Sequence, residues 1–182
     1  MVRNPDLTIT IILGSPASGK TTLARRLSAD LSLPCLCKDD IKEALFDRLG
    51  PGDRDWSRLL SEASFAALTR LAHTQLASGS SCILEGNWRE SHAAALRSML
   101  TACGARAVQI CCRAEPREIV RRFTSRTRHP GHLDGQLAQA ELAAAAGQAP
   151  AFMSLPGPRF AYDSDAPAAY AQLLMALKSW RL

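Results

Sequence analysis

The stretch Gly14-Ser15-Pro16-Ala17-Ser18-Gly19-Lys20-Thr21 matches the phosphate-binding pattern G-x-x-x-x-G-K-[ST] at every defined position. An apolar, β-branched run at 7–13 precedes it and predicts a buried strand, and residues 19–31 predict a helix. Strand, glycine-rich loop and helix, in this order, form the context in which this motif binds the phosphates of a nucleoside triphosphate. We therefore expect an α/β fold of the P-loop NTPase class.

The residue types in this loop suit a polyphosphate. Gly14 and Gly19 let the backbone curl so that its amide groups face an anion at the start of a helix. Lys20 offers a mobile positive charge for the β- and γ-phosphates, and Thr21 offers a hydroxyl ligand for Mg²⁺. ATP and Mg²⁺ are the expected cofactors, with Thr21 as metal ligand. The expected nucleotide-binding residues are Gly14, Ser15, Ala17, Ser18, Gly19, Lys20, Thr21 and Thr22.

Length and composition limit the class of protein. The 182 residues suit one domain, and 47% hydrophobic with 21% charged residues is a globular composition. No apolar run approaches a membrane span and residues 1–13 lack a cleavable signal pattern, so a cytoplasmic protein with no membrane partner is expected. The six cysteines form no C-x-x-C pair, which favours reduced core residues over zinc ligands.

Strand and helix patterns alternate along the chain. Parallel strands with helices on both faces follow from this alternation, and ligands then bind at the carboxyl ends of the strands. The segment 127–134 has the composition of a loop. Strands are expected at 7–13, 34–37, 80–84, 105–112 and 159–163. Helices are expected at 19–31, 40–49, 55–77, 89–102, 115–126, 135–146 and 167–181.

Acidic and amide side chains follow the second and third predicted strands. Asp39 would face the γ-phosphate and could orient and deprotonate an attacking hydroxyl, while Asp40 could cap the next helix. Glu85, with Asn87 nearby, could hold Mg²⁺ through water or contact an acceptor, or could be a structural acid at a strand end. Trp88 could stack on a substrate ring or make a hydrophobic contact.

Arginines gather near the fourth predicted strand and its following helix, at positions 113, 117, 121, 122, 126 and 128. Arg122 and Arg126 are four residues apart and would share a helix face. A mobile lid with arginines neutralises the transferring group in phosphoryl-transfer enzymes. A solvated basic face is the alternative. His129 and His132 follow in what would be a lid loop that touches substrate or nucleotide. A metal site is the alternative, although only two ligands are visible.

These motifs together resemble the small P-loop kinases of the AAA_33 type. Similar proteins are the kinase domain of phage polynucleotide kinase, zeta-toxin kinases and chloramphenicol phosphotransferase. The resemblance implies one kinase domain over 1–182 and a five-stranded parallel sheet in the order 2-3-1-4-5. It also implies a helical substrate-side insertion at about 50–78 and an arginine-bearing lid at about 122–147. Asp39 would be the general base, and Arg126, preceded by Arg122, the lid arginine, with Lys20 completing the catalytic group.

Two positions depart from the family pattern. Lys42 stands where relatives carry an arginine, and an ammonium is a poorer bidentate phosphate clamp than a guanidinium. Glu85 stands where an aspartate is common. Asp40, Lys42, Glu85 and Asn87 are the expected acceptor-side residues.

We expect an ATP-dependent kinase that transfers the γ-phosphate to a hydroxyl of a small molecule. A polynucleotide 5′-hydroxyl kinase is the alternative. The net charge of +5 favours it, whereas Lys42 and the aromatic content of only 5% oppose it. A nucleotide-dependent ATPase or switch is the third hypothesis.

Overall fold

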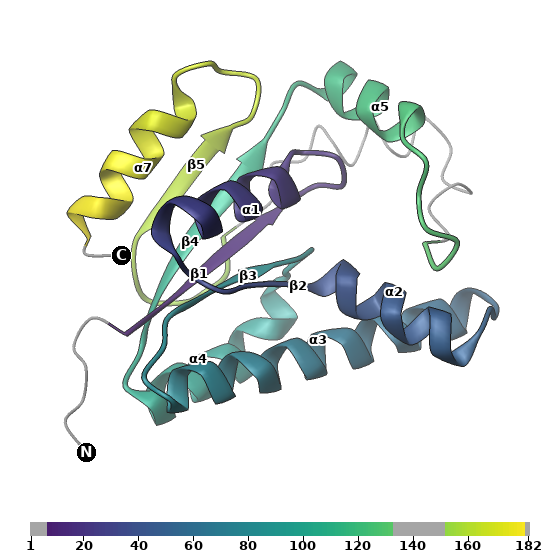
Figure 1. Cartoon of the computed structure of the whole chain (residues 1–182), viewed down its shortest axis with the longest axis horizontal. Coiled ribbons are helices and arrows are strands. Elements are labelled where there is room, and N and C mark those ends of the chain that lie inside the picture. Colours follow the sequence, from purple (N-terminus) through teal and green to yellow (C-terminus); the bar gives the residue numbers. More distant parts are fainter. Residues whose placement is uncertain (1–6, 133–151, 181–182) are drawn as a thin grey trace.

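Five parallel strands form the centre of the chain, whose computed structural model describes residues 7–132 and 152–180. Their order is β2-β3-β1-β4-β5, which confirms the predicted topology (Figure 1). β1 (Thr8–Gly14) is central, between β3 (Cys82–Glu85) and β4 (Arg106–Arg113). β2 (Cys35–Cys37) and β5 (Arg159–Asp163) are the edges.

Burial on both faces explains the composition of the central strand. All seven residues of β1 are buried, including the two threonines Thr8 and Thr10. A parallel sheet covered by helices on both sides selects such continuous β-branched, apolar runs. β1 pairs with β3 from Ile9 to Ile12 and with β4 along its whole length. The strand that carries the phosphate-binding motif is therefore held from both sides.

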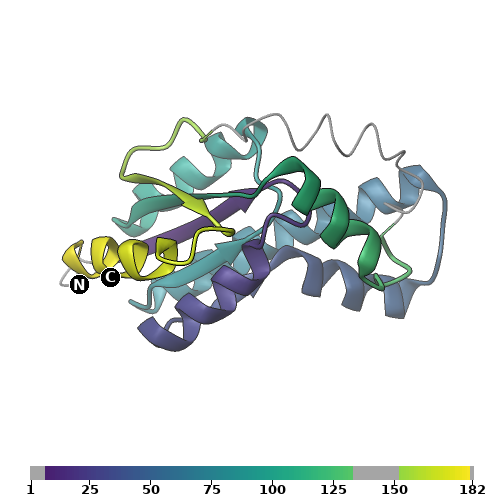
Figure 2. The same ribbon diagram turned by 90° about the horizontal axis from the view of Figure 1, so that it is seen from above.

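Helices cover both faces of this sheet (Figures 1 and 2). One face packs against α1 (Lys20–Leu31) and α7 (Ala169–Ser179), and the other against α3 (Arg54–Ala77) and α4 (Ala93–Cys103). A three-residue 3₁₀ turn, η1 (Glu90–His92), leads into α4. Within residues 7–132 and 152–180, no helix combines the length and the apolar character needed to cross a membrane.

Two more helices lie at the carboxyl ends of the strands, and neither has the bounds that the sequence predicts. α2 (Lys38–Leu49) begins two residues earlier than predicted, directly after β2, and packs against α3. α5 (Pro116–Ser125) ends before Arg126, which has an extended backbone. The predicted helix at 135–146 and the end of the predicted lid lie outside the described residues.

A buried glutamine ties the segment before β5 to the sheet. Gln109 of β4 is 1% exposed, and its side chain accepts a hydrogen bond from the Met153 N–H at 2.8 Å and donates to the Met153 carbonyl at 3.1 Å. This amide pair fixes where the chain re-enters the fold, because buried backbone groups need partners.

Candidate functional site

The loop between β1 and α1 has the tight curl that its motif predicts. Ala17 and Gly19 have positive φ angles of 61° and 90°, and the Ser18 N–H donates to the Ser15 carbonyl at 3.3 Å. A Cβ added to Gly14 would come within 2.6 Å of the Cys112 carbonyl oxygen. Only glycine fits that position, so the start of the loop can lie directly against β4.

Lys20 is the first residue of α1 and is 7% exposed. Its ammonium donates to the Ser15 carbonyl at 2.8 Å and so lies folded over the loop. Burial lowers the pKa of Lys20, although the nearby Glu85 carboxylate opposes that shift. A buried cation above a helix N-terminus is a strong attractor for phosphate.

Thr21 and Glu85 form an oxygen-rich pair beside this lysine. The Thr21 hydroxyl donates to Glu85 Oε2 at 3.1 Å, and Glu85, the last residue of β3, is 3% exposed. Burial raises the pKa of Glu85, with Lys20 acting in the opposite direction. A hydroxyl and a buried carboxylate are the hard oxygen donors that Mg²⁺ prefers, so this pair fits the ion that the motif implies.

Asp39 lies in the first turn of α2. Its carboxylate accepts from Lys38 Nζ at 2.9 Å and lies 3.9 Å from an Arg128 guanidinium nitrogen. Burial alone would raise the pKa of Asp39, but Lys38, His132 and Arg128 together hold it below its usual range. Asp39 is therefore ionised at neutral pH.

Asp40, predicted as an acceptor-side residue, lies apart from Asp39 and does not line the cavity described below. Its side chain is 61% exposed and lies 3.8 Å from Arg25 on the outer surface. The prediction that Asp40 caps the helix is wrong, because α2 begins before it, with Cys37 as the N-cap residue and no side-chain cap.

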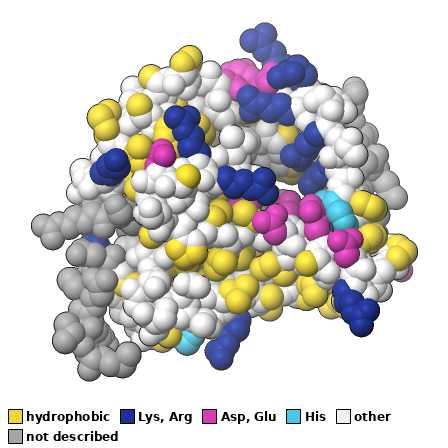
Figure 3. All heavy atoms as spheres, viewed as in Figure 1, with side chains coloured by type: hydrophobic (Ala, Val, Ile, Leu, Met, Phe, Trp, Pro, Cys, Tyr) yellow, Lys and Arg dark blue, Asp and Glu magenta, His cyan; other side chains and the backbone are white. Residues whose placement is uncertain are grey.

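The P-loop, α2 and the segment after α5 enclose a cavity of about 470 Å³. Figure 3 shows this face of the molecule, where lysine and arginine side chains surround a hollow that has acidic groups along one edge. Of the predicted nucleotide-binding residues, Ala17, Gly19, Lys20, Thr21 and Thr22 line the cavity, whereas Gly14, Ser15 and Ser18 do not. The other predicted residues that line it are Asp39, Lys42, Glu85, Asn87, Arg122 and Arg126.

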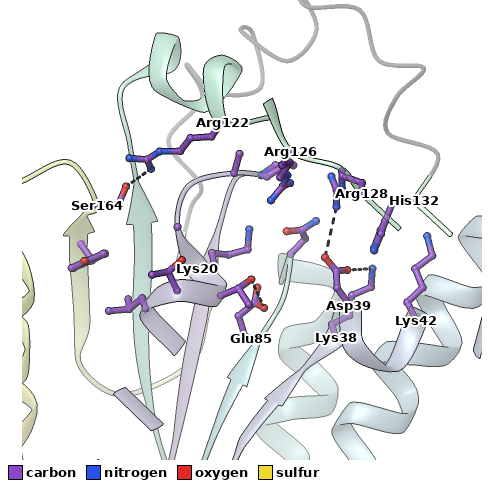
Figure 4. Close-up of a pocket in the computed structure, with 18 of the residues that line it drawn as sticks. Lys20, Lys38, Asp39, Lys42, Glu85, Arg122, Arg126, Arg128, His132 and Ser164 are labelled. Carbon is purple, nitrogen blue, oxygen red and sulfur yellow. Dashed lines mark hydrogen bonds and ion pairs between the residues drawn. The ribbon is translucent and has the colours of Figure 1, made fainter. Parts of the chain in front are cut away.

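The three lid arginines lie at different points along this cavity (Figure 4). Arg122 is bound by Glu118, Ser164 and Asp165, at the end away from Asp39. Arg126 lies between Arg122 and Arg128, and Arg128 lies above Asp39. The prediction that Arg122 and Arg126 share a helix face is wrong because α5 ends at Ser125, yet both line the cavity.

Two histidines connect the segment after α5 to α2. His132 Nε2 lies 2.8 Å from Glu43, and His129 Nε2 lies 3.0 Å from Asp47. His129 also packs edge-on against Phe46. Among the described residues no group of three or more His, Cys, Asp or Glu side chains could hold a metal ion. The two histidines connect the segment after α5 to α2 through these contacts.

Trp88 is a core residue. It is 5% exposed, and its ring lies 4.9 Å from that of Phe65 and 5.5 Å from that of His92. Of the two hypotheses for this residue, the structure supports hydrophobic packing over stacking on a substrate.

Several cavity residues had no assigned role in the sequence analysis. Lys38 could have been named from the sequence, because a lysine directly before Asp39 at the end of a strand must lie near that carboxylate. Ser61 and Arg26 lie on helices with no motif, so only the fold reveals them. The cavity residues without a predicted site role are Pro16, Leu23, Arg26, Lys38 and Ser61, whereas Arg128 and His132 belong to the predicted lid.

Comparisons with known proteins agree with this geometry. The AAA_33 family, described as an AAA domain, matches residues 9–150. A structure described as that of a “putative kinase” from Chloroflexus aurantiacus J-10-fl is 34% identical, with a TM-score of 0.87 over 96% of this chain and 98% of the other. No curated protein matches the sequence significantly.

Two more distant structures share the fold. A sugar kinase from Janibacter sp. HTCC2649 has 16% identity and a TM-score of 0.64, over 96% of this chain and 94% of the other. A gluconokinase from Sinorhizobium meliloti 1021 has 16% identity and a TM-score of 0.54, over 97% and 98%. The family match over most of the chain and the 34% identical structure show that this chain belongs to the AAA_33 family of P-loop proteins.

Proposed function

We propose that this chain is an ATP-dependent kinase that phosphorylates a hydroxyl of a small molecule. One observation carries the proposal: the Lys20–Thr21–Glu85 group and the Asp39 carboxylate line the same cavity from different walls. Phosphoryl transfer needs this arrangement, with the donor held on one side and the attacking oxygen oriented on the other. The three similar structures are all described as kinases, which supports phosphoryl transfer as the class of reaction.

The donor wall is built to hold a triphosphate. The loop amides and the α1 N-terminus face the phosphates, and Lys20 exchanges its Ser15 contact for phosphate oxygens. Thr21 and Glu85 would hold Mg²⁺, which supplies charge neutralisation at the β- and γ-phosphates when bound. Tyr162 and Ser164 line the end of the cavity near β5, where the nucleoside would lie.

The acceptor wall is built to orient a hydroxyl. Ionised Asp39 accepts the hydrogen bond of the acceptor hydroxyl and takes its proton as the oxygen attacks the γ-phosphorus. Lys38 fixes the carboxylate from one side at 2.9 Å and keeps it ionised. Arg126, with Arg128 nearby, neutralises charge on the transferring group. Arg122 could do the same only if its guanidinium left Ser164 and Asp165 and moved toward Asp39.

An acceptor screen with γ-labelled ATP tests the proposal. Neutral sugars, sugar acids, sugar phosphates, nucleosides and 5′-hydroxyl oligonucleotides are offered separately, and labelled products are identified by mass spectrometry. We expect a phosphorylated small molecule, and loss of that product in Lys20→Met. Exclusive labelling of oligonucleotides would establish the polynucleotide alternative, and ATP hydrolysis with no labelled acceptor would contradict the proposal in favour of an ATPase.

A further inference from the structure

A second cavity opens beside the first, on the side away from the P-loop. Its volume is about 560 Å³, and it lies between the first half of α3 and the segment that follows β3. The two cavities share the wall residues Lys38, Lys42, Ser61 and Asn87. A molecule bound near Asp39 can therefore extend directly into this second space.

Basic groups dominate the walls of the second cavity. Lys38, Lys42, Arg54, Arg58 and Arg89 line it, against the single carboxylate of Glu62. Two of these cations already face an acid, Lys38 at Asp39 and Arg58 at Asp55.

Arg54 and Arg89 are two of the three other cations of this cavity. Across residues 7–132 and 152–180, neither guanidinium lies within ion-pair distance of a carboxylate. They come from different elements, Arg54 from the first turn of α3 and Arg89 from the turn before η1, and meet at one cavity. Like charges converging from two elements favour an anion between them.

Lys42 lies where the two cavities meet. It is 5% exposed, and its ammonium donates to the Ser57 hydroxyl at 2.8 Å. This contact helps to hold the ammonium at the junction of the two cavities. This residue would thus contact the acceptor between its reacting hydroxyl and its far end.

We propose that the acceptor is a small hydroxylated anion whose carboxylate or phosphate occupies the second cavity, bound by Lys42, Arg54 and Arg89. This inference rests on the proposed kinase function, because it places the reacting hydroxyl at Asp39. A sugar acid or a sugar phosphate has this chemistry.

The walls fit a compact anion better than a nucleic-acid strand. The aromatic side chains of the second cavity are Phe65 and His92, and their rings pack on one another at 4.2 Å. Phe65 also packs against buried Trp88 at 4.9 Å. Single-strand binding relies on aromatic faces open to the bases, and these rings are already engaged with each other.

Matched acceptors test the inference. The rate constant kcat/KM is compared for a neutral hexose, the corresponding aldonic acid and the corresponding hexose phosphate, at low and high salt. We expect kcat/KM to be about 10- to 100-fold higher for one of the two anions, in line with a charge-assisted contact. The anion with the higher kcat/KM shows whether the second cavity prefers a carboxylate or a phosphate. Higher salt should reduce the preference.

The double variant Arg54→Gln/Arg89→Gln should raise KM for the anion about 10-fold or more while KM for ATP stays the same. Arg70→Gln serves as the control, since Arg70 is an exposed arginine of the same helix that lines neither cavity. Equal kcat/KM for neutral and anionic acceptors, preference for oligonucleotides, or equal effects of the double variant and the control would overturn the inference.

Calorimetric titration of the aldonate and the hexose phosphate separates this inference from the proposed function. The titration uses protein saturated with a non-hydrolysable ATP analogue. If the anion binds to the unmodified chain, fails to bind to the double variant and is never phosphorylated, the anion site is supported and the proposed kinase function is contradicted. If a neutral acceptor is phosphorylated and neither anion binds, the proposed kinase function is supported and the anion site is contradicted.

Discussion

At the scale of single residues, the contrast between Asp39 and Asp40 is the most informative. Successive side chains on an α-helix point about 100° apart, so neighbours in the first turn of α2 face different surroundings. Asp39 lies in the cavity among Lys38, Arg128 and His132, whereas Asp40 lies outside beside Arg25. Their sequence context is the same, but only Asp39 can meet a substrate.

The charge of Lys38 sets the pH range in which Asp39 is ionised. Lys38→Met removes the cation at 2.9 Å and leaves the burial of Asp39, so its pKa should rise. In the proposed mechanism ionised Asp39 is the active form, so activity falls as the pH drops through its pKa. The acid limb of the kcat profile should therefore move to higher pH in Lys38→Met and stay in place in Lys38→Arg. An unchanged limb in Lys38→Met would show that this lysine does not tune the reaction.

The sequence predicted the donor-side residues because the P-loop has fixed spacing. Lys20 and Thr21 occupy defined positions of a motif, and Asp39 and Glu85 could be named because parallel strands end at one edge of the sheet. Ser61 and Arg26 could not be named. Each is one polar residue on an amphipathic helix, and the helix rotation that turns it toward the cavity depends on packing with the rest of the fold.

At the scale of elements, the order of strands and helices was predictable, while several helix ends were not: the helix predicted at 89–102, for example, is the turn η1 followed by α4 from Ala93. α2 begins at Lys38 without a side-chain cap, so no capping residue marked its start. α5 ends at Ser125 although basic residues continue beyond it, and composition alone could not locate that end. These shifts of one or two residues decide which side chains face the cavity.

The Gln109–Met153 contact offers an element-scale test. Gln109→Met keeps the side-chain volume but leaves the buried Met153 N–H without its acceptor. The Met153 carbonyl keeps Leu155 and Arg159 as donors. The free energy of unfolding should fall by about 1–3 kcal/mol. Urea denaturation measures it, with Gln172→Met on the exposed face of α7 as a control that should change by less than about 0.5 kcal/mol. Equal losses in both variants would mean that the contact contributes nothing.

At the scale of the whole molecule, the sheet order brings three distant segments to one edge. The P-loop follows central β1, Glu85 ends neighbouring β3, and Asp39 follows edge strand β2, so all three segments line one cavity. The order β2-β3-β1-β4-β5 came from the resemblance to a family, since hydrophobic periodicity does not reveal which strands are neighbours. The second cavity also depends on this arrangement, because α3 and the segment after β3 meet only in the folded chain.

The most direct test of the central claim compares Asp39→Asn with Asp40→Asn in a single-turnover assay. The acceptor identified in the screen and saturating ATP are used, and ATP affinity is measured in parallel. Asp39→Asn should lower the transfer rate by about 10²- to 10⁴-fold, the usual loss for a general base, with ATP still bound. Asp40→Asn should stay within about threefold of the unmodified chain, as expected for an exposed residue outside the site. A transfer rate in Asp39→Asn equal to that in Asp40→Asn would contradict the account.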